Sequence, residues 1–114
     1  MIPLAKIRKF AQEIGREYQP DRVVLFGSYA RGDATNDSDV DVLVIMPYTG
    51  KSPEKSVEIR LKLDPDFPLD LLVRTPQEVS RRIEMGDCFM REIVTQGTVL
   101  YETHDSGMDI QGRG

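Results

Sequence analysis

The first part of the chain carries apolar residues at steps of three and four, which is the spacing of one face of a helix. These residues are Leu4, Ile7, Ala11, Ile14 and Tyr18. The segment Gln19-Pro20-Asp21 ends the pattern, so an amphipathic helix is predicted to stop near residue 18. A short apolar run over residues 23–26 then has the character of a β-strand and stops at Gly27.

The centre of the chain alternates polar and aliphatic stretches. Residues 28–31 are expected to start a short helix, and residues 32–38 are polar and rich in turn formers. The run from Val40 to Met46 is almost wholly aliphatic, which is typical of a strand covered on both faces. A second strand is therefore expected there, followed by a loop over residues 47–50.

The pattern of the segment after this loop fits two kinds of element. Apolar residues alternate over positions 57–63, as they do in a strand. The preceding Ser52-Pro53-Glu54 is typical of a helix start, with serine as the cap and proline at the first helical position. We interpret the segment as a helix that ends at Asp64-Pro65-Asp66.

The last part of the chain predicts a third strand and two more helices. The strand covers residues 69–74. Thr75-Pro76-Gln77-Glu78 is a capping box that opens a helix to about Glu84. Asp87 is the expected cap of the next helix, which Gly97 ends. Residues 99–101 predict either a short terminal strand or an extended edge.

This order of elements predicts the fold class. Helices alternate with strands, so we expect an α/β domain with a small, mixed central sheet flanked by helices. The domain is expected to span residues 1–102, and residues 103–114 are expected to form a polar, frayed tail. A chain of 114 residues fits one domain with a single core.

Composition and charge narrow the range of partners. The chain is 39% apolar and 30% charged, a balance typical of folded globular proteins. Its net charge of −4 argues against an extended nucleic-acid interface, which needs a basic surface. No segment has the composition of a signal peptide or the length of a membrane span, so no membrane partner is expected. Cys88 is the only cysteine and cannot form an internal disulfide, and together these features predict a cytoplasmic protein.

Two acidic residues stand at the head of the aliphatic central strand. Residues two apart on a strand point to the same face, so Asp39 and Asp41 are expected to project side by side. Adjacent carboxylates repel each other unless a cation lies between them, and Mg²⁺ prefers oxygen ligands. The alternative is a turn aspartate followed by a charge at the strand edge. The apolar surroundings disfavour that alternative, because a buried charge is costly unless it is paired or bound to a metal.

A glycine–serine loop and a third acid extend this candidate site. Gly27 and Ser28 follow a strand and open a short helix, where backbone N–H groups can receive a phosphate. Arg31 lies one helical turn further on and could reach the same phosphates, although a solvated surface charge is the alternative. Asp70 lies inside another aliphatic strand. If the acid-bearing strands are neighbours, three carboxylates converge as in a two-metal phosphoryl or nucleotidyl transfer site.

The spaced motif formed by these residues resembles that of the DNA polymerase beta-type nucleotidyltransferase superfamily. It consists of Gly27-Ser28, ten intervening residues, Asp39-x-Asp41 and a later strand aspartate, Asp70. The short chain is similar to the minimal nucleotidyltransferases of that superfamily, from the first helix to about Glu102. The resemblance implies transfer of a nucleoside monophosphate from a nucleoside triphosphate, with ATP as the expected substrate, to an acceptor hydroxyl with release of pyrophosphate.

The resemblance also implies a role for each residue of the motif. Gly27 and Ser28 would hold the triphosphate, and Arg31 matches, more loosely, a phosphate-contacting arginine of some relatives. Asp39 and Asp41 would bind two Mg²⁺ ions. Asp70 would bind the catalytic Mg²⁺ and help to activate the acceptor.

A partner protein is a further implication of the resemblance. Minimal nucleotidyltransferases often act as the antitoxin of a helical HEPN toxin, and some transfer AMP to a tyrosine hydroxyl of that toxin. Two alternatives stay open: a non-catalytic module that neutralises or scaffolds a partner by contact, and a transferase acting on a small molecule or a nucleic-acid end. The strand acids favour an enzyme over the module, and the negative net charge disfavours the last alternative.

Overall fold

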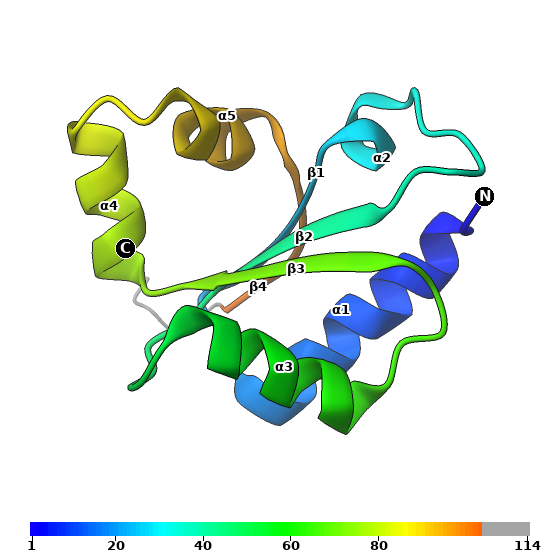
Figure 1. Ribbon diagram of the computed structural model, residues 1–114, viewed down its shortest axis with the longest axis horizontal. Coiled ribbons are helices and arrows are strands. Elements are labelled where there is room, and N and C mark those ends of the chain that lie inside the picture. The colour runs from blue at the N-terminus through cyan, green and yellow to red at the C-terminus, as the bar shows by residue number, and fades with distance from the viewer. Residues whose placement is uncertain (104–114) are drawn as a thin grey trace.

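Four strands form one mixed sheet in the order β3-β2-β1-β4 in the computed structural model, which describes residues 1–103 (Figure 1). The strands are β1 (Arg22–Phe26), β2 (Val40–Ile45), β3 (Leu69–Arg74) and β4 (Thr98–Glu102). The helices are α1 (Leu4–Tyr18), α2 (Ser28–Arg31), α3 (Ser52–Leu63), α4 (Pro76–Glu84) and α5 (Cys88–Gln96). The predicted α/β class with a small mixed sheet is confirmed. The expected tail, apart from Thr103, lies outside the described residues.

The directions of the strands follow from their connections. β1 pairs antiparallel with both β2 and β4, whereas β2 pairs parallel with β3. Parallel neighbours need a crossover connection, and α3 supplies it between β2 and β3. β4 confirms the terminal strand that was one of two alternatives for residues 99–101, and it begins at Thr98.

Two hydrophobic layers lie on opposite faces of the sheet. α1 and α3 cover one face, and α4 and α5 cover the other (Figure 1). In β2, Val40, Val42 and Val44 join the first layer, whereas Leu43 and Ile45 join the second. Side chains of a strand alternate between its faces, so Asp41 points to the same side of the sheet as Leu43 and Ile45.

The segment with two possible interpretations is a helix, α3. Ile59 is fully buried, whereas Val57 and Leu61 are 54% and 77% exposed. The apolar alternation therefore does not mark a buried strand face. One detail of the prediction was wrong: Lys51 occupies the cap position, and Ser52 lies inside the first turn. The Ser52 hydroxyl instead donates to the Val73 carbonyl oxygen, at 2.7 Å, and so ties the start of α3 to β3.

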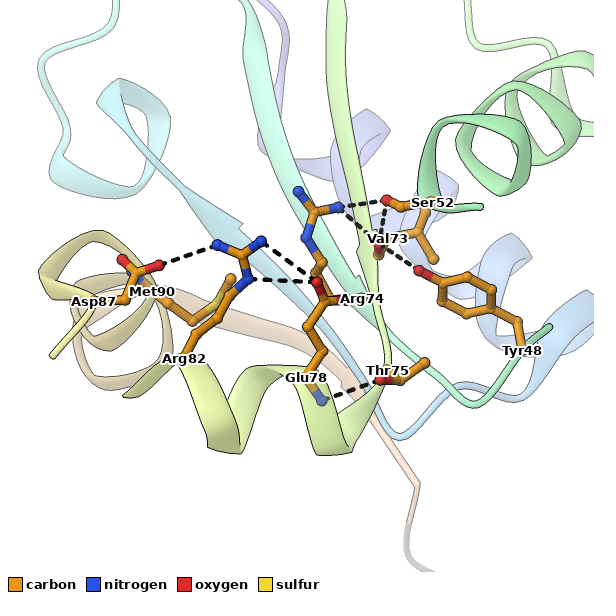
Figure 2. A network of polar contacts seen from close by, with 9 residues as sticks. All are labelled: Tyr48, Ser52, Val73, Arg74, Thr75, Glu78, Arg82, Asp87 and Met90. Carbon is orange, nitrogen blue, oxygen red and sulfur yellow. Dashed lines mark hydrogen bonds and ion pairs between the residues drawn. The ribbon is translucent and has the colours of Figure 1, made fainter. Parts of the chain in front are cut away.

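A polar network fixes the helix starts at the far end of β3 (Figure 2). The Val73 carbonyl oxygen accepts hydrogen bonds from the Tyr48 hydroxyl, the Ser52 hydroxyl and the Arg74 guanidinium. Thr75 Oγ1 accepts from the Glu78 N–H at 3.1 Å, which confirms the predicted cap of α4.

A second part of this network joins α4 to α5 (Figure 2). Asp87 Oδ1 accepts from the Met90 N–H at 2.9 Å, which confirms the predicted cap of α5. Arg82 lies between Glu78 and Asp87 and forms an ion pair with each at 3.4 Å. The position of α5 on the sheet therefore depends on its capping aspartate and on α4.

Asp87→Ala is expected to lower the melting temperature at neutral pH, because it removes a helix cap and an ion pair. The Met90 N–H, with help from Arg82, holds the pKa of Asp87 below its ordinary value. A lowered pKa means that this stabilisation is present at neutral pH and is lost as the pH falls through the pKa of the folded state. Thermal melts should therefore show a gap between wild type and variant that closes in acid. An equal gap at both pH values, or an equal effect of Glu84→Ala, would contradict this account.

Candidate functional site

The loop between β1 and α2 is shaped by a glycine. Gly27 has a φ of +73°, a backbone conformation that residues other than glycine rarely adopt. Its carbonyl oxygen accepts from the N–H groups of Ala30 and Arg31, and these bonds form the turn of α2. A Cβ at Gly27 would overlap the carboxylate of Asp41. The Asp41 side chain therefore lies directly against the backbone of the glycine–serine loop.

The register of the sheet brings Asp70 beside Asp41. In the parallel pairing of β2 with β3, these two aspartates are direct cross-strand partners. In the antiparallel pairing of β1 with β2, Asp41 stands opposite Phe26, the residue before Gly27. Asp41 therefore occupies the middle position between the loop and the third predicted acid. This proximity confirms that the strands carrying the acids are neighbours.

Asp39 lies just outside the strand. β2 begins at Val40, where the aliphatic run predicted it, so Asp39 is the residue directly before the strand. The expectation that Asp39 and Asp41 project side by side stays a prediction. The polar loop over residues 32–38 reaches the sheet there, and the first ladder bond of β2 is donated by Val40 to Pro68. Asp39 is exposed, but its charge still acts on Asp41.

The charge balance of the site is negative. Burial raises the pKa of Asp41 above its ordinary value, and the charges of Asp70 and Asp39 raise this pKa further. Arg31 acts in the opposite direction and lowers the pKa of Asp41, but it does not offset the other effects. An additional positive charge beside these carboxylates would stabilise them in their ionised form.

The acids lie close together but do not form a complete metal-binding site. Within residues 1–103, no three histidine, cysteine, aspartate or glutamate side chains gather as a ready-made metal-binding group. Asp39 and Asp70 are exposed and carry the same charge as Asp41, so the three carboxylates repel one another where no cation lies between them. Oxygen ligands of this type suit Mg²⁺, which commonly binds through one or two carboxylates and completes its shell with water and substrate phosphates.

Arg31 is the last residue of α2, the short helix that follows Gly27. It forms an exposed ion pair with Asp33 at 3.4 Å. An exposed pair of this kind is weak, because water screens it. The guanidinium is therefore available for a stronger anionic ligand beside Gly27.

A pocket of about 280 Å³ opens next to the loop. It lies between α2 and α5, and Figure 1 shows these two helices on either side of the end of β1. Its lining residues are Phe26, Gly27, Ala30, Arg31, Phe89, Glu92, Ile93, Gln96 and Gly97. Sequence reasoning missed the contribution of α5. The available signal was the spacing of Phe89, Glu92 and Gln96, which places all three on one side of a helix.

No helix among residues 1–103 combines the length and the apolar character that crossing a membrane requires.

Sequence relatives carry names that agree with this geometry. A profile of the nucleotidyltransferase domain family matches residues 7–101. A predicted protein adenylyltransferase of Methanocaldococcus jannaschii is 38% identical over 69 residues, which are 59% of this chain and 70% of the relative. A second predicted protein adenylyltransferase of the same organism is 27% identical over 99 residues, which are 83% of this chain and 94% of the relative.

Solved structures share the fold. A predicted nucleotidyltransferase from Sulfolobus solfataricus superposes with a TM-score of 0.63 at 18% identity, covering 90% of this chain and 82% of that one. A toxin–antitoxin structure determined with AMP-PNP superposes with a TM-score of 0.51 at 24% identity, covering 90% of this chain and 75% of that one. At these identities the likeness concerns the fold, and the family follows from the sequence match. The chain belongs to the nucleotidyltransferase domain family and is a nucleotidyltransferase.

Proposed function

We propose that the chain transfers AMP from ATP to a hydroxyl group of a partner protein, in a reaction that depends on Mg²⁺. The observation that carries this proposal is the position of Asp41, whose carboxylate lies against Gly27 and whose cross-strand partner is Asp70. One end of a nucleoside triphosphate held at the loop would then face the acids. The names of the two archaeal relatives support AMP as the transferred group and a protein as its acceptor.

Each residue of the motif has a part in this proposal. Gly27 and Ser28 would hold the triphosphate through backbone N–H groups and the serine hydroxyl, and Arg31 would neutralise phosphate charge. Asp39 and Asp41 would hold two Mg²⁺ ions, and Asp70 would share one of them. Bound there, Mg²⁺ would neutralise charge on the phosphates and on the acids. The raised pKa of Asp41 is consistent with this assignment: it reflects burial first, and then the negative charges of Asp70 and Asp39, which Arg31 leaves uncompensated.

The reaction proceeds by in-line displacement at the α-phosphorus. The acceptor oxygen forms a bond to this phosphorus while the bond to the bridging oxygen breaks, and pyrophosphate leaves with the electron pair. The acceptor hydroxyl loses its proton to Asp70, which is exposed at the edge strand and open to an incoming side chain. The chain's own contribution is to align the three groups at one end of the sheet.

A HEPN-type toxin is the proposed acceptor protein, with this chain as its antitoxin. The fold neighbour from a toxin–antitoxin structure with AMP-PNP supports this pairing. A helical partner would have to present a hydroxyl-bearing side chain to Asp70.

Mass spectrometry of the partner provides the test. The full chain is incubated with the purified HEPN candidate, ATP and Mg²⁺, and we expect the partner to gain the mass of one or more AMP groups. A chelator should prevent the gain, since the reaction needs the metal. A partner that is neutralised without any change in mass would contradict the transferase proposal and favour the non-catalytic binding module.

A further inference from the structure

We propose that the pocket between α2 and α5 is the subsite for the base of the donor nucleotide, and that it selects a base with an exocyclic amino group. Phe89 would form the stacking surface, and Glu92 and Gln96 would contact the edge of the base. This proposal rests on the proposed function, because it assigns the part of the nucleotide that the loop and the acids do not hold.

The pocket is continuous with the candidate site. Gly27 belongs both to its lining and to the loop that touches Asp41. Phe26 forms another part of the lining and is the cross-strand partner of Asp41. A ligand seated in the pocket therefore lies next to the loop that touches Asp41, so the base and the phosphates of one nucleotide can occupy the pocket and the loop together.

The size of the pocket limits what it can hold. Sites that enclose whole drug-sized ligands measure about 300–1,000 Å³. At about 280 Å³, this pocket lies just below that range and has room for a base. The phosphates of the same nucleotide would then lie over the glycine–serine loop, whose Gly27 also lines the pocket.

An aromatic ring with a large exposed surface stands at the wall of the pocket. Phe89 packs edge-to-face against Phe26, with ring centroids 5.8 Å apart, and remains 56% exposed. Phe26 is only 8% exposed, so the buried ring holds the exposed one in place. Exposed aromatic rings beside phosphate sites stack well with bases, because every base has a π-face.

The charges around the pocket favour one orientation of a bound nucleotide. Arg31 lies on the α2 side, and Glu92 lies on the α5 side. Among residues 1–103, no ion pair joins Glu92 to a basic side chain. A carboxylate repels phosphates, so the phosphates belong near Arg31 and the base belongs near Glu92.

The side chains on α5 favour a particular pattern of hydrogen bonding. An ionised glutamate only accepts hydrogen bonds, whereas a glutamine amide both donates and accepts. Glu92 can therefore accept from an exocyclic amino group, and Gln96 can donate to a neighbouring ring nitrogen. Adenine presents this pair of groups on one edge.

The α5 wall is held close to the sheet. A Cβ at Gly97 would overlap the Ile93 carbonyl oxygen, the Val24 side chain and the Leu25 carbonyl oxygen. The end of α5 thus contacts β1 without a side chain between them. Such close packing keeps Glu92 and Gln96 at a fixed distance from the loop.

Calorimetric titration of the full chain with two probes tests the stacking role. Phe89→Ala should weaken binding of a non-hydrolysable ATP analogue with Mg²⁺ by about tenfold or more, as base–aromatic stacking predicts. Binding of tripolyphosphate with Mg²⁺, which has no base, should not change. The matched control is Arg91→Ala, an exposed residue of α5 outside the pocket, which should leave the affinities for both probes unchanged.

A second variant tests the edge contacts. Wild type should bind the ATP analogue more tightly than a purine riboside triphosphate, which lacks the exocyclic amino group. Glu92→Ala should close this gap and leave tripolyphosphate binding intact, because the carboxylate is the expected acceptor.

Three outcomes would overturn the subsite. Equal loss of ATP analogue and tripolyphosphate in Phe89→Ala would make Phe89 a general structural residue. If Phe89→Ala lost affinity for neither probe, the base would bind elsewhere. The same conclusion would follow if the variant weakened binding of a partner protein and left both affinities unchanged. Transfer is measured separately, so a wild-type chain that showed base-dependent binding but no transfer would contradict the proposed function and retain the subsite. A wild-type chain that bound neither probe would contradict both proposals.

Discussion

Asp41→Asn is expected to abolish nucleotidyl transfer and, at the same time, to raise the melting temperature of the metal-free chain. The loss of transfer should be at least about a thousandfold, since a metal ligand at the reacting phosphate contributes several kcal/mol to the transition state. The gain in stability has a separate cause. Burial and the charges of Asp70 and Asp39 raise the pKa of Asp41, so the ionised side chain opposes folding at neutral pH.

The pH dependence of this effect has a definite sign. A raised pKa means that the folded state holds the proton more tightly than the unfolded chain does. Stability is therefore lost as the pH rises from the unfolded pKa through the folded pKa of Asp41. The variant has no such loss, so its advantage should be absent in acid and present at neutral pH. Added Mg²⁺ should raise the melting temperature of the wild type and have little effect on the variant.

Asp37→Asn is the matched control for Asp41→Asn. Asp37 is an exposed acid in the loop before β2, and it lies outside the strand pairing of β2 with β1 and β3. Asp37→Asn should retain transfer, and its melting temperature should equal that of the wild type. Full transfer by Asp41→Asn, or a lower melting temperature without metal, would contradict the assignment of Asp41.

Gly27→Ala is expected to reduce transfer by about a hundredfold or more, because small displacements of reacting groups have effects of this size. Alanine at a positive φ costs about 1–2 kcal/mol wherever it occurs. At Gly27 the new Cβ would also overlap the Asp41 carboxylate, and overpacking of this kind adds about 1–3 kcal/mol. The two effects together push the loop and the acid apart.

Gly32→Ala separates the backbone effect from the overlap. Gly32 also has a positive φ, of +86°, but a Cβ there would meet nothing within 4 Å. Denaturant unfolding should therefore show a smaller loss of stability in Gly32→Ala than in Gly27→Ala. The double variant Gly27→Ala/Asp41→Ala should recover part of the stability, because it removes the overlapping carboxylate, and should stay inactive. Additive effects in this cycle would contradict direct contact between the two residues.

The sequence was sufficient for most of the secondary structure because its local signals are strong. Thr75 and Asp87 are good capping residues, and both accept the hydrogen bonds expected of caps. The aliphatic run after Asp39 predicted a strand buried on both faces, and the strand formed has only Asp41 partly exposed. The start of α3 was less accurate, because Ser52 bonds to β3 and not to its own helix.

The site could be predicted only in outline. The residue types and their spacing predicted the acids and the loop. The start of β2 at Val40 was predictable from the aliphatic run, because that signal is local. The parallel register that pairs Asp41 with Asp70 was not predictable in this way, because it is a long-range property. The overlap of a Gly27 Cβ with Asp41 was equally beyond local signals, because it depends on how β1 and β2 pair.

The pocket was missed for a different reason. Phe89 and Glu92 have the composition of an ordinary amphipathic helix, and nothing in that composition indicates which loop α5 will face. Only the docking of α5 on β1, close enough to require Gly97, brings them to Gly27 and Arg31.

Because β2 and β3 run in the same direction, the chain must return through α3 before Asp70 can reach Asp41. A chain that has been synthesised only to residue 63 thus contains the glycine–serine loop, Asp39 and Asp41, but not Asp70. If Asp70 has the role proposed above, activity arises only late in synthesis, after the crossover has folded back and β3 has paired with β2. A nascent or truncated chain that ends before β3 would then be inactive as a transferase.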